Sequence, residues 1–145
     1  MSVDQYRRDV EAKAKKRREA ESKAGDYRIK ESKKRTEAAK ARQSAAKASS
    51  EATVRSRIRE AELREKEAAS AGSEANRWQS KATGYARDEA SATEKLSKAI
   101  AAEDKKRQQD SERAARNEKA RLARLESRVA NVSATMERVV RDPVQ

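Results

Sequence analysis

Apolar residues recur at steps of three and four along most of this chain, which favours amphipathic α-helix over strand or loop. A first seam of such positions runs from Val3 to Ala52, slips by one residue there, and resumes at Val54. It passes through Gly25 without a change of phase, so this glycine is expected inside a helix. The larger members of the seam are Val3, Tyr6, Val10 and Tyr27, with Ile58 after the slip.

A second seam begins at Ala75 and extends to Arg113, with Trp78, Tyr85 and Leu96 as its larger members. A stutter over residues 114–118 shifts its phase. A strict heptad pattern follows, here called the apolar stripe: Leu122, Leu125, Val129, Val132, Met136 and Val139. Asp142 and Pro143 are expected to end the helix, because the residue before a proline is pushed out of helical geometry.

Between the two seams lies Ala71-Gly72-Ser73, which the sequence predicts as a turn. Gly72 suits the left-handed conformation that ends many helices, and Ser73 is a favourable N-cap. A turn there gives arms of equal length, and it pairs Glu31 with Arg113 and Lys34 with Asp110. It also places Val3, Tyr6 and Val10 against Met136, Val139 and Val132.

The predicted fold is therefore all-α, an elongated antiparallel helical hairpin or coiled coil, with a capacity to self-associate. Its expected parts are a first long helix over 1–70, a turn at 71–73, a second long helix over 74–142 and a tail at 143–145.

Two other arrangements fit the same periodicity. One uninterrupted helix, about 210 Å long at 1.5 Å per residue, could pair with a second chain. A bundle of three or more shorter helices is suggested by the echo between SKAGDYR (22–28) and SKATGYAR (80–87). The irregular phases and the charged seam positions argue against a designed helical sequence.

The composition supports long helices rather than a globular core. Only 34% of residues are apolar, 43% are charged, and Phe is absent. Low hydrophobicity with high net charge is also typical of disorder, but Ala, Glu, Lys and Arg are strong helix formers. Because most of the seam is alanine, each layer gains little energy, and the hairpin is expected to need self-association or a partner.

Residues suited to catalysis or metal binding are scarce. The chain has no His and no Cys, which excludes imidazole chemistry, thiolate chemistry and the usual zinc ligands. No glycine-rich phosphate loop occurs, and adjacent acidic residues on a helix do not share a site. We therefore expect no enzyme activity, no cofactor and no small-molecule substrate. Neither a secretory leader nor an apolar run long enough to span a membrane is present, which suggests a cytoplasmic protein.

The net charge of +12 points to a second class of function. Residues 1–50 carry 16 basic and 8 acidic side chains, whereas residues 51–97 carry nine of each. A basic stripe can bind nucleic acid or another polyanion without sequence preference, and a membrane surface is a further possible target. The plainer interpretation is a solvated coiled-coil exterior. The candidate anion-binding residues are Lys15, Lys16, Arg17, Arg18, Lys33, Lys34, Arg35, Lys105, Lys106 and Arg107.

The leading functional hypothesis is a coiled-coil scaffold, oligomerisation or adaptor module without catalytic activity. Its partners would be other protein helices, either further copies of the chain or an appended or separate effector domain. The helix–helix interface candidates are Val3, Tyr6, Val10, Tyr27, Ile58, Trp78, Tyr85, Leu96 and the six residues of the apolar stripe.

The stretches SVDQYRRDVEAKAKKRREAESKAGDYRIKE and ANRWQSKATGYARDEA resemble the N-terminal helical region of actinobacterial multidomain proteins. In those proteins a CHAT-like or TIR-like signalling or effector domain follows the helices. The resemblance implies an assembly or adaptor role in a bacterial signalling or defence system. It assigns a function to no individual residue.

Overall fold

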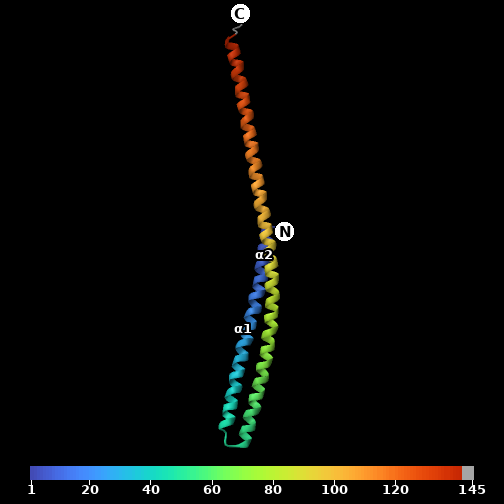
Figure 1. The fold of residues 1–145 in the computed structure, drawn as a ribbon, viewed down its shortest axis with the longest axis vertical. Coiled ribbons are helices and arrows are strands. Elements are labelled where there is room, and N and C mark those ends of the chain that lie inside the picture. Colours follow the sequence, from blue (N-terminus) through green and yellow to red (C-terminus); the bar gives the residue numbers. More distant parts are fainter. Residues whose placement is uncertain (142–145) are drawn as a thin grey trace. The chain divides into compact units, whose positions relative to one another are not determined.

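The computed structural model describes residues 1–141, and they form two α-helices, α1 (Val3–Lys47) and α2 (Glu51–Arg141). No strand occurs among these residues. The two helices pack antiparallel along α1, which confirms the all-α helical hairpin (Figure 1). Over residues 1–141 the chain forms neither a single uninterrupted helix nor a bundle of three or more helices. The chain divides into two units, residues 1–97 and 98–145, which are described separately below.

A capping box starts α1. The Ser2 hydroxyl accepts a hydrogen bond from the Gln5 backbone N–H at 3.2 Å, and the Gln5 side chain accepts one from the Ser2 N–H at 2.7 Å. These reciprocal bonds satisfy backbone groups that a helix N-terminus otherwise leaves without a partner. The local sequence therefore defines where α1 begins.

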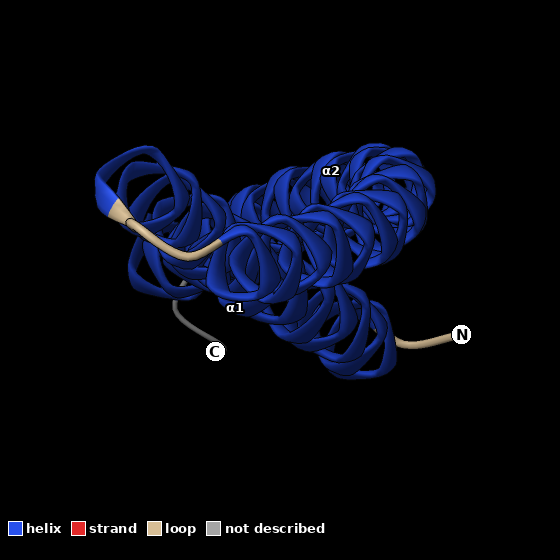
Figure 2. Cartoon of the chain, turned by 90° about the horizontal axis from the view of Figure 1, so that it is seen from below, coloured by secondary structure: helices blue, strands red, loops and turns tan. Residues whose placement is uncertain are grey.

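The turn of the hairpin lies at Ala48-Ser49-Ser50, so the predicted turn at 71–73 is wrong (Figure 2). Ala48 leaves the helix with φ −72° and ψ 140°. The next helix begins when the Val54 N–H donates to the Ser50 carbonyl at 3.0 Å. The predicted helices over 1–70 and 74–142 are wrong for the same reason, because α1 ends at Lys47 and α2 begins at Glu51.

Gly72 lies inside α2, and no glycine among the described residues has a positive φ. Its lack of a side chain instead accommodates a neighbour on α1, because a Cβ at this position would lie 3.0 Å from a carboxylate oxygen of Glu31. Gly72 therefore serves the packing of the two helices rather than a turn. The predicted helix end at Asp142 and the tail at 143–145 lie outside the described residues.

The core of the hairpin is a seam of alanines. No polar or charged residue among residues 1–141 is fully buried, and no large side chain is either. Small residues allow two helix backbones to approach closely, but each layer removes little apolar surface from water. The buried residues are Ala14, Ala20, Ala24, Ala38, Ala41 and Ala45 of α1, with Ala61, Ala68, Ala71, Ala75, Ala82 and Ala92 of α2.

Candidate interaction surfaces

Three surfaces are candidates for function: the seam between α1 and α2, the basic exterior of α1, and the apolar stripe on residues 98–141. Most predicted interface residues of the hairpin do lie in the seam, where they are half-buried at its edges. Ile58 is the exception, with 37% of its surface exposed. The half-buried residues are Val3, Tyr6, Val10, Tyr27, Trp78, Tyr85 and Leu96.

Ion pairs across the seam establish which residues face each other. The Lys34 ammonium lies 2.9 Å from a carboxylate oxygen of Glu67, and the Arg64 guanidinium lies 3.3 Å from Glu37. The predicted pairing of Lys34 with Asp110 is therefore wrong. Glu31 does not pair with Arg113 either, because its carboxylate accepts hydrogen bonds from Arg28 and Arg35 on its own helix.

Two arginine–glutamate pairs add geometric specificity to this register. Arg42 binds Glu65 through two parallel hydrogen bonds, both 2.9 Å long, from Nε and one terminal nitrogen. Farther from the turn, Arg17 Nε donates to Glu89 at 2.5 Å. The Arg42 contact is bidentate, and such contacts are stronger and more directional than single charged contacts such as that of Arg17 with Glu89. Together the two pairs favour one alignment of the two helices.

The pKa shifts of these groups follow from the same contacts. The hydrogen bond from Lys34 lowers the pKa of Glu67, and the reciprocal bond raises the pKa of Lys34. The hydrogen bonds from Arg42 lower the pKa of Glu65 in the same way. All of these groups are therefore charged near neutral pH. Because they are solvated at the edges of the seam, salt screens them, and they contribute more to register than to stability.

Trp78 forms an aromatic platform at the edge of the seam. The ammonium groups of Lys23, on α1, and Lys81, on α2, each lie 4.2 Å from the centre of its ring. Both contacts have cation–π geometry. Tyr27, Asp26 and Lys30 line a hollow of about 340 Å³ beside the ring. The indole thus contacts side chains of both helices, and the two nearest ammonium groups already lie over its ring.

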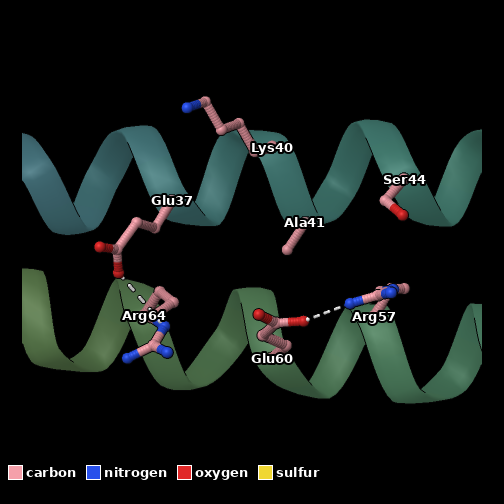
Figure 3. Close-up of a pocket in the computed structure, with 7 residues that line it drawn as sticks. All are labelled: Glu37, Lys40, Ala41, Ser44, Arg57, Glu60 and Arg64. Carbon is pink, nitrogen blue, oxygen red and sulfur yellow. Dashed lines mark hydrogen bonds and ion pairs between the residues drawn. The ribbon is translucent and has the colours of Figure 1, made fainter.

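A second hollow, of about 320 Å³, opens beside Ala41 nearer the turn (Figure 3). Its charged walls are paired with each other: Arg57 contacts Glu60 at 3.0 Å, and Arg64 contacts Glu37. Lys40 points away from α2 in this view (Figure 3). Because its carboxylates and guanidinium groups are ion-paired with one another, although Glu37 Oε2 accepts no hydrogen bond, the hollow resembles a gap in a salt-bridge network more than a substrate site.

The predicted basic clusters on α1 are divided between paired and unpaired side chains. Arg17 and Lys34 bind carboxylates across the seam, and Arg35 binds Glu31 on its own helix. Arg18 binds Glu11. Lys15, Lys16 and Lys33 are exposed and form no ion pair with any residue in the range 1–141.

α1 also carries a regular row of lysines that consecutive basic residues do not reveal. Their separations of seven, seven, three, seven and seven residues keep them along one side of the helix. Lys23 contacts Trp78, whereas the other five form no ion pair within the described part of the chain. Heptad spacing was the signal that would have identified this lysine row: Lys16, Lys23, Lys30, Lys33, Lys40 and Lys47.

In the second unit, Arg107 forms an ion pair with Glu103 at 2.6 Å, and Lys105 and Lys106 are exposed. A turn at 71–73 would bring these three residues near Ala38 on the first helix. That placement is wrong, because the stretch of α1 around Ala38 is paired with residues 64–67.

The apolar stripe is exposed along its whole length. Between 43% and 66% of the surface of each of its side chains is accessible, and every residue from 104 to 141 is exposed. The prediction that the stripe closes the hairpin against Val3, Tyr6 and Val10 is therefore wrong. A strict heptad pattern of Leu, Val and Met on one side of a helix is typical of a coiled-coil seam.

Within residues 1–141, neither helix contains a segment long and apolar enough to cross a membrane. Comparison with known proteins adds no assignment, since the chain matches no protein-family model, no curated protein and no solved structure.

Proposed function

We propose that this protein is a non-catalytic scaffold that assembles through the apolar stripe of residues 98–141. The observation that carries the proposal is the contrast between its two units. The hairpin covers its own seam with alanines and pairs many of its charges internally. The stripe has the spacing of a helix-packing surface, yet nothing in the described chain covers it.

The energetics favour a role in association. Each Leu, Val or Met side chain contributes about 1.5–3 kcal/mol when it is fully buried. The six stripe residues are already partly covered by their own helix, so burial against a second helix yields a fraction of that sum from each chain. That gain is comparable to the roughly 4–15 kcal/mol that association costs. We therefore expect a reversible assembly that brings together effector domains, either appended to the chain or on separate partners. The resemblance to the actinobacterial helical regions supports this role.

The test compares the assembly state of stripe variants with that of matched surface variants. Leu125→Glu with Val132→Glu puts two charges into the stripe and is expected to weaken self-association at least about 100-fold, since it removes two apolar layers from each chain. Ser127→Glu with Ala134→Glu puts the same charges, with the same spacing, on the opposite side of the helix. Sedimentation equilibrium measures the mass of each protein. Equal association by the stripe variant and the wild type would refute the proposal.

A second candidate function, polyanion binding, is favoured by the lysine row. α1 carries the entire positive excess of the hairpin, because residues 51–97 are neutral. Five lysines of the row have no acidic partner within the described chain. Lysines that point into solvent are suited to contact phosphates through release of counterions.

Changing Lys16, Lys30, Lys33 and Lys40 together to Gln is expected to reduce affinity for a random-sequence DNA duplex at least about 10-fold at low salt, with a shallower dependence of log K on log salt. The same four positions changed to Arg retain the charge and should bind as the wild type does. Fluorescence anisotropy at several salt concentrations provides the measurement. Wild-type protein that does not bind even at about 50 mM salt, where phosphate contacts are strong, would eliminate this candidate.

A further inference from the structure

The apolar stripe defines the heptad positions of residues 118–141. Leu122, Val129 and Met136 occupy position a, and Leu125, Val132 and Val139 occupy position d. The stripe thus contains six consecutive apolar layers. Glu118, at the preceding d position, ends it, and its carboxylate is bound by Arg121 at 2.7 Å.

Within residues 1–141, only the stripe itself offers an apolar surface of complementary length and spacing. The other exposed large apolar residues of helical segments, such as Ile29 and Leu63, are isolated from one another. The hollows along the hairpin are lined mainly by charged and polar side chains. A second copy of the stripe supplies the same six layers with the same spacing, so that the surface is self-complementary.

The polar flanks of the stripe distinguish the two possible orientations. In a parallel, in-register pair, position g of one helix faces position e of the other, five residues further on. This brings Arg121 of each chain to Glu126 of the other. In an antiparallel pair with the same number of apolar layers, Glu126 faces Ser133 and Arg128 faces Thr135, so neither meets an opposite charge within residues 122–140. Arg121 then faces position 142, which lies outside the described residues.

Two further features favour the parallel orientation. Glu126 forms no ion pair within the described residues, so its carboxylate is available to a second chain. Arg121, which already binds Glu118 of its own helix, would then bridge the two carboxylates. Val140, at position e, is 81% exposed; in the parallel pair it faces Thr135, whereas in the antiparallel pair it faces Lys119. Half of the basic residues of this segment, Arg124, Arg138 and Arg141, are at the outward positions c and f, where they do not oppose association.

We propose that residues 121–140 of two copies of this chain form a parallel, in-register, two-stranded coiled coil, with Arg121 of each chain paired with Glu126 of the other. This inference rests on the proposed scaffold function and specifies its partner, orientation and register. Each stripe residue then packs against the same residue of the other chain. Leu125 at d and Val129 at a match the preference of two-stranded coils, whereas Leu122 at a and the valines Val132 and Val139 at d depart from it, so the dimer mass is part of the test.

The experiment uses single cysteines, because the natural chain has none. Leu122→Cys and Val139→Cys lie at opposite ends of the stripe, about 25 Å apart along the helix. In the parallel coil, each variant alone is expected to form a disulfide-linked dimer in a glutathione redox buffer. In an antiparallel coil neither links to itself, since a disulfide needs Cα atoms within about 7 Å, and only an equimolar mixture of the two variants gives linked dimers.

Ser127→Cys, at the outward position f, measures the background of random oxidation. Sedimentation of each reduced variant verifies that it still assembles. Self-linking of both end variants above this background, with a dimer mass, supports the proposal. Linking only in the mixture, or a trimer mass, overturns it but leaves the scaffold function standing. A monomeric wild-type chain at high concentration overturns both.

Charge substitutions test the register independently. Glu126→Arg places a second guanidinium opposite Arg121 and is expected to weaken the dimer at least about 5-fold, because like charges then face each other across the coil. Arg121→Glu combined with Glu126→Arg exchanges the two charges and should restore association. Glu137→Arg makes the same charge change at position b, away from the partner, and serves as the control. Equal effects of Glu126→Arg and Glu137→Arg would contradict the proposed pairing.

Discussion

Replacing Ala68 and Ala75 together with leucine is expected to destabilise the hairpin by about 2–6 kcal/mol, because both alanines are completely buried in the seam between α1 and α2. A side chain that adds three carbons to a closely packed position forces the helices apart, at a cost of about 1–3 kcal/mol per site. The surrounding alanine layers contribute little energy of their own, so the hairpin has little stability to lose.

Ala69→Leu with Ala86→Leu is the matched control, because both residues are on the same helix but exposed to solvent. Urea unfolding followed through the fluorescence of Trp78, the only tryptophan, reports on the seam itself. Leucine at the a and d positions of an ordinary coiled coil stabilises it. A gain in stability by the Ala68 and Ala75 variant would therefore show that the two helices are not held together closely at these layers.

Ser73→Pro is expected to cost about 3 kcal/mol or more, whereas Ser49→Pro is expected to have little effect. Ser73 lies within α2, where proline removes a backbone hydrogen bond and clashes with the preceding turn of the helix. Ser73 is exposed, so no loss of packing contributes to the effect. Ser49 lies in the turn, and Ala48 before it already has the extended conformation that a following proline requires.

The two proline variants have opposite expectations if the chain turns at 71–73. Far-UV circular dichroism measures the helix content of each variant, and thermal unfolding measures its stability. A tolerated proline at residue 73, together with a disruptive one at residue 49, would contradict the position of the turn. Equal losses of helix content and stability in both variants would show that residues 48–50 are more helical than the structure has them.

Much of the hairpin could be read from the sequence. The predicted seam on α1 is confirmed from Val3 to Ala48, because every position of it is buried or half-buried. Even its charged members, such as Arg17 and Glu31, lie at the edges of the seam. Periodicity succeeds here because a residue's place on the helix surface depends only on its spacing along the chain.

The position of the turn was misjudged although the sequence contained a signal for it. The phase of the seam slips near Ala52, immediately after Ser49 and Ser50. From Ala61 to Leu96, in contrast, the three–four spacing passes through Gly72 without interruption. The same continuity predicts Gly25 inside α1, where the structure has it. It holds equally at Gly72, which lies inside α2.

The sequence by itself determined the helices, the seam of α1 and the heptad pattern of the apolar stripe, because these follow from local propensity and spacing. Only the tertiary structure decided which stretches pair and that the stripe is left uncovered. The physical reason is the alanine seam: one alanine layer packs almost as well against another as against its true partner, so many registers have similar energies. Directional contacts such as Arg42 with Glu65 and Arg17 with Glu89 distinguish among them.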